Sequence, residues 1–343
     1  MGTNITPLLT PTPITLEELA GKQLAIDAHN IIYQFLTTIR MRDGTPLRDS
    51  KGNITSHLIG LFNRTATLIE KNILPVFVFD GKPPELKQEE IRRRRALKEA
   101  AAAAFEEAKA SEDVEAMAKY AGRTTKLTPD LISEAKKLLS SMGVPSIDAP
   151  SEGEAQAAYL VKNGDAYAVV SQDADALLFG APRLIKNLNI AGKRKQVGKH
   201  IYQTTHPELV TLTQTLNHLQ ITQDQLIALG ILVGTDYCPG GAKGIGPKKA
   251  LALLRKHGTN FEAAFKEAKW EEQTNIPWKE IFKLFKQPAI TTQYTIKREK
   301  PNPVRIRNLL VQEHDFSPER VEHTIKKLEN SRILNQKGLA DYF

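Results

Sequence analysis

The sequence contains little cysteine, few aromatic residues and no long apolar run. Its 343 residues include one cysteine, Cys238, which excludes an intrachain disulfide and a cysteine-rich zinc site and fits a reducing compartment. No apolar stretch approaches the ~20 residues that a membrane-spanning helix requires. The first residues have no basic segment followed by an apolar one, so nothing there indicates a secretory signal. The chain is therefore expected to be intracellular, without membrane attachment.

Positive charge is in excess over negative charge. Lysine and arginine number 47 against 39 aspartate and glutamate, which gives a formal net charge of +8. The sequence pI of about 9.3 indicates a polyanionic partner, and composition alone leaves open nucleic acid or an anionic membrane surface. With 41% hydrophobic residues, a chain of this length is typical of a globular protein with about two domains, or one large domain with additions.

Short apolar runs alternate with helical patterns in the first part of the chain. Three runs rich in β-branched residues predict buried strands: KQLAID (22–27), LPVFVFD (74–80) and AYAVVSQD (166–173). Residues 56–72 and 128–143 have apolar residues at helical spacing, and the second helix is expected to begin at Thr128 and Pro129 and to end at Gly143. This alternation predicts an α/β fold with a twisted, mostly parallel sheet covered by helices on both faces.

Two regions depart from this alternation. Residues 85–127 are highly charged and rich in alanine, so we expect helices that project from the body. Residues 221–300 show helical patterns only, interrupted by the glycine-rich turn PGGAKGIGPKK (239–249). The predicted parts are an α/β core (1–220, including the projecting helices), an all-helical region (221–300), a part that packs on the core (301–330) and a tail (331–343).

Acidic residues follow the carboxyl ends of the predicted strands, the edge of a parallel sheet where loops diverge and ligands bind. These strand-end acids are Asp27, Asp80 and Asp173, and three more lie near them in sequence: Asp175, Glu152 and Glu154. Each acid alone has a simpler explanation. A single aspartate after a strand often forms a turn, and Ser151 with Glu154 matches a capping box.

Taken together, the six acids predict a metal site. Clustered carboxylates raise one another's pKa and destabilise the fold unless cations neutralise them. Oxygen ligands without a cysteine or histidine motif select Mg²⁺ or Mn²⁺, and six acids suggest two ions. Two divalent ions ~4 Å apart stabilise the attacking and leaving oxygens of a phosphoryl substitution. This chemistry is typical of nucleases and agrees with the excess of positive charge.

Six motifs resemble those of a known family: AIDAHNIIYQFL, VFVFDGKPPELK, APSEGEAQAAYL, SQDADALLFG, GTDYCPGGAKGIGPKKA and QKGLADYF. In this order they are similar to the flap endonucleases of the structure-specific 5′ nuclease superfamily, from about residue 20 to the end of the chain. The resemblance implies a PIN-like nuclease core with a helical arch and a helix-hairpin-helix region. It also implies seven metal-binding carboxylates: Asp27, Asp80, Glu152, Glu154, Asp173, Asp175 and Asp236.

The resemblance implies roles for basic and aromatic residues as well. Lys87 and Arg94 correspond to residues that act on the scissile phosphate, and their spacing of two helical turns lets both face one side of the arch. From the residues alone, the run IRRRRALK also fits a solvated helical face. Tyr33 corresponds to an aromatic on which a base stacks near the cut, and core packing explains it equally well.

The glycine-rich turn has a spacing like that of a P-loop. Pro247 stands in place of the required lysine and no serine or threonine follows, so we exclude ATP binding. A helix-hairpin-helix turn fits better, because Gly244 and Gly246 let the backbone approach a phosphate and Lys248 and Lys249 add charge. By the resemblance, this turn grips duplex DNA through a monovalent cation. A plain glycine-rich loop is the alternative.

The tail ends in a motif with the spacing of a sliding-clamp ligand: Gln336, Leu339, Tyr342 and Phe343. The expected partner is a clamp of the proliferating cell nuclear antigen type, and a frayed terminus is the alternative. Ending at this motif is typical of archaeal members, so an archaeal source is expected. The expected location is then the cytoplasm or nucleoid.

Four more residues receive an interpretation. By the resemblance, Thr55 and Arg64 belong to a site for a 3′ flap. His29 stands where small residues are usual and is interpreted as packing near the site. Cys238, close to Asp236, is interpreted as a core thiol, since thiolate is a poor Mg²⁺ ligand.

The expected function is Mg²⁺-dependent hydrolysis of a 5′ flap near its junction with duplex DNA, in Okazaki fragment processing and repair. The resemblance implies two-metal catalysis with Mn²⁺ as a substitute, an accompanying 5′–3′ exonuclease activity and a monomeric enzyme. Two alternatives remain open. One is a related nuclease acting mainly as an exonuclease or on four-way junctions, and the other is a non-catalytic, clamp-recruited DNA-binding module.

Overall fold

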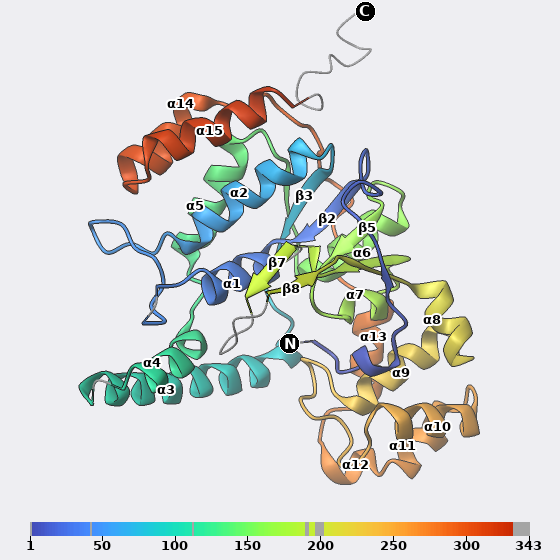
Figure 1. Ribbon diagram of the computed structural model, residues 1–343. Coiled ribbons are helices and arrows are strands. Elements are labelled where there is room, and N and C mark those ends of the chain that lie inside the picture. Colours follow the sequence, from blue (N-terminus) through green and yellow to red (C-terminus); the bar gives the residue numbers. More distant parts are fainter. Residues whose placement is uncertain (1, 42, 112, 189–191, 196–201, 332–343) are drawn as a thin grey trace, which may run out of the picture.

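A seven-stranded sheet lies at the centre of the computed structural model, which describes residues 2–41, 43–111, 113–188, 192–195 and 202–331 (Figure 1). The strand order is β1-β9-β6-β5-β2-β3-β4. The strands are β1 (Thr12–Pro13), β2 (Gln23–Asp27), β3 (Leu74–Phe79), β4 (Ser146–Asp148), β5 (Ala168–Val170), β6 (Arg183–Lys186) and β9 (Glu208–Thr211). Strands β2 to β6 pair in parallel, while β9 is antiparallel to β6 and β1. The prediction of a mostly parallel sheet is confirmed, with an added antiparallel edge.

Helices cover both faces of the sheet, because side chains along each strand alternate between two apolar cores. On β2, Leu24 and Ile26 belong to one core and Ala25 to the other. The first core is closed by α1 (Ala28–Thr38), α2 (Ser56–Glu70), α5 (Pro129–Ser141), α14 (Pro303–Arg307), a π-helical turn (Asn308–Glu313) and α15 (Pro318–Glu329). The second is closed by α6 (Gly153–Lys162), α7 (Asp175–Leu178), α9 (Gln223–Val233) and the helices between residues 247 and 286.

The predicted helix boundaries are confirmed where capping residues marked them in the sequence. The Thr128 hydroxyl accepts a hydrogen bond from the Leu131 amide, Pro129 is the first residue of α5, and Gly143 beyond its end has a φ of +72°. The Ser317 side chain likewise caps α15. Capping is readable from sequence because it depends only on neighbours within one turn.

The arch, residues 85–127, is a helical hairpin that projects from one side of the molecule (Figure 1). It consists of α3 (Gln88–Ala110) and α4 (Val114–Ala121) between 3-10 turns at Glu85–Lys87 and Gly122–Thr124. Small side chains allow the two helices to approach, and Ala101, Ala108 and Ala121 are buried. No strand occurs among the described residues of this segment, as predicted.

The second half contributes a group of helices below the sheet in Figure 1. They are α8 (Leu212–Leu219), α9, α10 (Pro247–His257), α11 (Phe261–Glu267), α12 (Trp270–Gln273) and α13 (Trp278–Lys286). Phe265 stacks on Trp278 with 4.5 Å between ring centroids, and Trp270 packs edge-on against Phe265. None of the described helices has the length and hydropathy needed to cross a membrane.

Residues 288–300 have neither helix nor strand, which corrects the expectation of helical patterns throughout 221–300. The chain leaves α13 at Pro288 and continues through β-branched residues that disfavour helix. Glu299 then donates its amide to the Gly143 carbonyl at 3.1 Å. The sequence did not reveal the short strands β1, β4, β6 and β9, nor the hairpin of β7 (Gly192–Lys195) and β8 (Tyr202–Thr205).

Candidate active site

One cavity of about 240 Å³ gathers all seven predicted acids at the carboxyl end of the central strands. They are Asp27, Asp80, Glu152, Glu154, Asp173, Asp175 and Asp236. We call this space the acid-lined cavity. Its wall also contains Gly2, His29, Asn30, Tyr33, Lys87, Arg94, Lys98 and Leu127. Segments from the N-terminus, the sheet, the arch and the helical region therefore meet at one point.

Strand ends and helix starts place the acids. Asp27 ends β2 and caps α1, since its carboxylate accepts the Asn30 amide at 3.0 Å. Glu152 is the N-cap residue of α6, and Glu154 lies in the first turn of that helix. Asp236 follows α9 through Gly234, whose φ of +111° and contact with the backbone of Gly240 leave no room for a side chain.

The capping-box explanation of Glu154 is wrong. Its carboxylate does not turn back to cap α6 but accepts the Ser171 hydroxyl at 2.9 Å, across the cavity on the segment after β5. The Ser171 hydroxyl also lies 3.4 Å from Asp27. Glu154 therefore belongs to the acidic cluster rather than to a local helix-start device.

The environment disfavours negative charge on several of these carboxylates. Burial, followed by repulsion from Asp80, raises the pKa of Asp27 to about 7, and burial raises that of Asp175 to about 6. Burial and the negative charge of Asp175 raise the pKa of Glu154 well above its usual range. Burial also raises the pKa of Glu152. A bound cation would reverse this balance, because it stabilises the charged form of each acid.

Two cations from the base of the arch contact the cluster. Lys87 Nζ lies 2.6 Å from Glu152 Oε2 and 3.3 Å from Asp236 Oδ2, and the guanidinium of Arg94 pairs with Asp236. Burial opposes charge on Lys87, but Glu152 and Asp236 outweigh it and raise the lysine pKa. Buried Glu90 orients Arg94, with Oε1 2.5 Å from Arg94 Nε. Lys87 and Arg94 thus face one side, as their spacing predicted.

Arg95, by contrast, points away from the cavity. Its side chain is 78% exposed and pairs with Glu99 on the outer surface of α3. The basic run therefore combines the two interpretations that the sequence allowed, since one arginine turns inward and its neighbour forms part of a solvated face.

Three residues of the cavity wall were not identified as functional from the sequence. The Gly2 amide donates to Asp173 at 2.9 Å, and Asn30 Nδ2 donates to the same carboxylate at 3.0 Å. His29 packs edge-on against Phe79 beside the cavity, as expected, and its Nδ1 also lies 2.7 Å from Asp80 Oδ2, a contact that packing does not explain. The signal for His29 and Asn30 was their position in the first turn of the helix that Asp27 caps. Gly2 gave no such signal.

The donor set fits hard divalent cations, because every candidate ligand is a carboxylate oxygen. Within the described residues, no three potential ligands already converge closely enough to hold one ion. Several carboxylates instead pair with Lys87, Arg94 and His29. Cation binding at this cluster therefore requires the carboxylate oxygens that face Lys87 and Arg94 to turn from these partners toward the ion.

Tyr33 lies in the wall of the acid-lined cavity and is only partly buried. Lys98 Nζ from the arch lies 5.2 Å from the centre of its ring. Core packing alone does not explain an aromatic in this position. Cys238, by contrast, is buried, as predicted for a core thiol.

The glycine-rich turn connects two helices, α9 and α10, which agrees with the rejection of a P-loop. Gly246 is the N-cap residue of α10, and Gly244 has a φ of +77° with open space where a side chain would stand. Lys248 and Lys249 are exposed beside it. Backbone amides and two ammonium groups are therefore accessible at one helix start.

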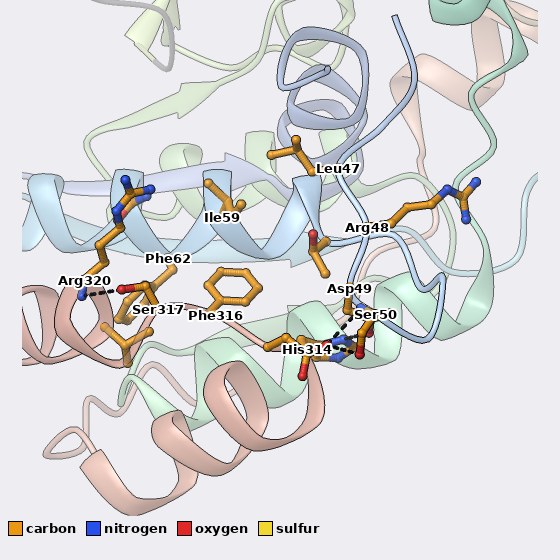
Figure 2. A pocket seen from close by; sticks show the side chains of 14 residues that line it. Leu47, Arg48, Asp49, Ser50, Ile59, Phe62, His314, Phe316, Ser317 and Arg320 are labelled. Atoms are coloured by element: carbon orange, nitrogen blue, oxygen red, sulfur yellow. Dashed lines mark hydrogen bonds and ion pairs between the residues drawn. The ribbon is translucent and has the colours of Figure 1, made fainter. Parts of the chain in front are cut away.

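A second cavity, of about 520 Å³, lies between α2, the loop before it and the start of α15 (Figure 2). We call it the α2–α15 pocket. Its apolar lining comes from Leu47, Ile59, Phe62, Phe316 and Val321, and its polar lining from Arg48, Asp49, Ser50, Thr55, Asn63, His314, Asp315, Ser317 and Arg320. In Figure 2, Arg48 and Arg320 lie at opposite ends of the apolar part.

The structure separates Thr55 from Arg64. Thr55 lines the α2–α15 pocket, whereas Arg64 does not. Burial lowers the pKa of Arg64 to about 10, and its Nε and Nη2 have no hydrogen-bond partner in the described part of the chain. The predicted clamp-binding residues Gln336, Leu339, Tyr342 and Phe343 lie outside the described residues.

The fold and the acid-lined cavity define a structure-specific nuclease of the XPG type. Sequence profiles described as the XPG N-terminal domain and the XPG I-region match residues 4–101 and 143–236. The chain belongs to the flap endonuclease 1 family. It is 52% identical to flap endonuclease 1 of Pyrococcus horikoshii over 344 residues, covering 100% of this chain and 98% of that protein. For the Staphylothermus marinus protein the identity is 48% over 334 residues, with 96% and 94% covered.

Solved structures agree with this assignment. Flap endonuclease-1 from Methanococcus jannaschii superposes with a TM-score of 0.77 at 43% identity, covering 98% of this chain and 100% of that one. The catalytic core of Rad2 in complex with a DNA substrate gives a TM-score of 0.67 at 26% identity, with 94% and 97% covered. The chain is a nuclease, and the main interpretation of the sequence is favoured over a non-catalytic module.

Proposed function

We propose that the chain cleaves 5′-flapped DNA near the junction and that its seven clustered acids hold two Mg²⁺ ions, which Mn²⁺ can replace. The observation that supports this most is the convergence of seven carboxylates on one cavity, four of them with raised pKa values. So many buried acids are costly unless cations neutralise them. Two divalent ions would stabilise charge on the attacking and leaving oxygens of a phosphodiester.

The chain's own residues position the DNA around this centre. Lys87 and Arg94 leave their carboxylate partners and contact the scissile phosphate, where fixed cations stabilise developing charge. The side chain of Tyr33 stacks on a base next to the cut, and the arch surrounds the single-stranded flap. Two other sites contact the DNA away from the cut, one on the duplex and one on an unpaired nucleotide.

One duplex contact is the turn before α10. Gly244 and Gly246 bring backbone groups to the DNA backbone, with a monovalent cation between them, and Lys248 and Lys249 contribute salt-dependent attraction. The other is the α2–α15 pocket, which receives the unpaired 3′ nucleotide of the upstream strand. Its apolar centre suits a base, and Thr55, Arg48 and Arg320 suit sugar and phosphate. Arg64, on the same helix as the pocket wall, is proposed as a separate DNA contact.

The tail is proposed to bind a sliding clamp through Gln336, Leu339, Tyr342 and Phe343, which would keep the nuclease at replication and repair sites. Surface plasmon resonance with the trimeric clamp tests this. Replacing Tyr342 and Phe343 by alanine should abolish binding while cleavage of free flap substrate persists. Equal binding by the variant would disprove the assignment.

The central test is divalent-ion-dependent cleavage of a labelled 5′-flap duplex. Asp173→Asn should abolish cutting and weaken Mn²⁺ binding measured by calorimetry, since it removes one charged oxygen ligand from the cavity. The matched control is Asp148→Asn at the end of strand β4 of the same sheet, where the carboxylate is 69% exposed and outside the cavity. If Asp173→Asn cuts as fast as the control, the metal assignment is wrong.

A further inference from the structure

His314 is buried between two carboxylates at one end of the α2–α15 pocket. Its Nδ1 lies 2.9 Å from Asp49 Oδ2 and its Nε2 lies 3.6 Å from Glu134 Oε1 on α5. The second oxygen of Glu134 lies 3.1 Å from Nε2 of His57, a fully buried residue of α2. These four side chains connect the loop before α2, helices α2 and α5, and the turn before α15.

Asp49 organises the loop on its side of this contact. Its carboxylate is fully buried and accepts the amides of Lys51 at 3.0 Å and Asn53 at 2.8 Å, and the Asn53 side chain at 2.8 Å. Although burial alone raises the pKa of Asp49, hydrogen bonds from Asn53, His314 and the backbone lower it to about 2. Asp49 thus holds residues 49–53 in one conformation as a charged acceptor.

The same loop is attached to the turn before α15 at a second point. The Ser50 amide donates to Asp315 Oδ2 at 2.8 Å, next to the His314 contact. Asp315 has a φ of +57°, so the turn has a specific backbone conformation rather than a freely variable one. The loop and the turn lie 265 positions apart in sequence and meet only through such contacts.

These contacts lie at the end of the pocket where its two walls meet. The loop side supplies Leu47 and Arg48, and the turn side supplies Phe316 and Ser317 (Figure 2). Figure 2 shows His314 and Asp49 together at the end where these two walls meet. If the contact between His314 and Asp49 is lost, a buried carboxylate loses a partner. The remaining hydrogen bonds between the loop and the turn come from Ser50 to Asp315 and from Lys51 Nζ to the Glu313 carbonyl at 3.3 Å, and both involve exposed side chains.

We propose that His314 and Asp49 are positioning residues that set the nuclease's preference for substrates with an unpaired 3′ nucleotide. They do so by fixing the two walls of the α2–α15 pocket. This inference rests on the proposed function of that pocket. Neither residue needs to touch the nucleotide, since Phe316, Thr55 and the two arginines provide the proposed contacts.

The test compares two substrates that carry the same 5′ flap and differ in one unpaired 3′ nucleotide on the upstream strand. Single-turnover rates and KM are measured for the parent, His314→Ala, Asp49→Ala and the double variant. The parent should prefer the substrate with the nucleotide. In each single variant, the ratio by which the substrate with the nucleotide is preferred should fall about tenfold. The fall should come mainly from a higher KM for that substrate, as expected when a buried hydrogen bond to a charged group is lost. The double variant should lose no more than the worse single variant.

Controls separate positioning from general damage. His323→Ala, on α15 but outside this pocket, should keep the full preference, and His314→Gln, which retains a donor, should restore part of it. Thermal melts establish that each variant is folded. If His314→Ala keeps the parent's preference, or slows both substrates equally, the positioning role is disproved while the pocket assignment stands.

The pocket assignment itself has a separate readout. Phe316→Ala removes an apolar wall and should abolish the preference even with His314 in place. If the parent shows no preference and Phe316→Ala changes neither rate, the proposed function of the pocket fails, and the role of His314 fails with it.

Discussion

The ammonium group of Lys87 lies 2.6 Å from the carboxylate of Glu152 and so connects the base of the arch to the acid-lined cavity. Arg94, two helical turns further, makes the corresponding connection to Asp236. Because the same cations are proposed to meet the scissile phosphate, their carboxylate partners hold them close to their place of action. Preorganised charge of this kind requires little rearrangement when the substrate binds.

Lys87→Ala and Arg94→Ala should each lower the single-turnover cleavage rate by about 10²-fold, because each removes a fixed cation from developing negative charge. Flap-binding affinity, measured by fluorescence anisotropy, should change much less. Arg95→Ala is the matched control, since its side chain points to solvent from the same helix. If Arg95→Ala lowers the cleavage rate as much as Arg94→Ala does, the role of Arg94 does not depend on its orientation toward the cavity, and the prediction is wrong.

Gly2→Ala should impair cleavage through a steric effect on Asp175. A Cβ at this position would lie 2.7 Å from Asp175 Oδ1, closer than side-chain carbons approach oxygen, so the carboxylate must shift. Misplacing a catalytic group by about 1 Å costs on the order of 10²-fold in rate, so the smaller shift of Asp175 should lower the rate by up to that factor. Gly122→Ala, where a Cβ meets nothing within 4 Å, should cut at the parental rate. Equal rates for both variants would contradict the prediction.

His29→Ala should weaken Mn²⁺ binding by about tenfold, because the imidazole that orients Asp80 is lost. Calorimetry without DNA measures this directly and separates it from effects on the substrate. His218→Ala, an exposed histidine on α8, provides the control. Unchanged Mn²⁺ affinity in folded His29→Ala would show that the contact between His29 and Asp80 has no role in ion binding.

The free energy of unfolding of the metal-free protein should depend on pH through Asp27 and Asp175. Their pKa values of about 7 and about 6 exceed the ~3.9 of an unfolded aspartate, so the folded state binds more protons between those limits. Their contribution to the free energy of unfolding is therefore present at low pH. It is lost as the pH rises through the folded pKa values.

Urea unfolding in EDTA at pH 5 and pH 8, compared between the parent and Asp27→Asn, measures this contribution. The parent should lose stability relative to the variant at pH 8. Added Mn²⁺ should reverse the loss, because ions bind the deprotonated carboxylates of the folded state. If the difference in the free energy of unfolding between the parent and Asp27→Asn is the same at pH 5 and pH 8, the raised pKa of Asp27 is contradicted.

Local sequence signals predicted much of the fold and the site. Thr128, Pro129 and Gly143 delimit α5 because capping depends on neighbours within one turn. Asp27 and Asp80 could be placed together because parallel strands end at a common edge. The strands β4, β6 and β9, with three or four residues each, are too short to show a period and were missed.

The residue types of the site, the alternation of strands and helices, and the capping residues could all be read in the amino-acid sequence, since they follow from chemistry and from contacts between near neighbours. By contrast, the folding of the whole chain brings the Gly2 amide to Asp173, His29 to Asp80 and His314 to Asp49. Such pairs are set by how helices and loops pack around the sheet, and no local pattern encodes packing over that many positions.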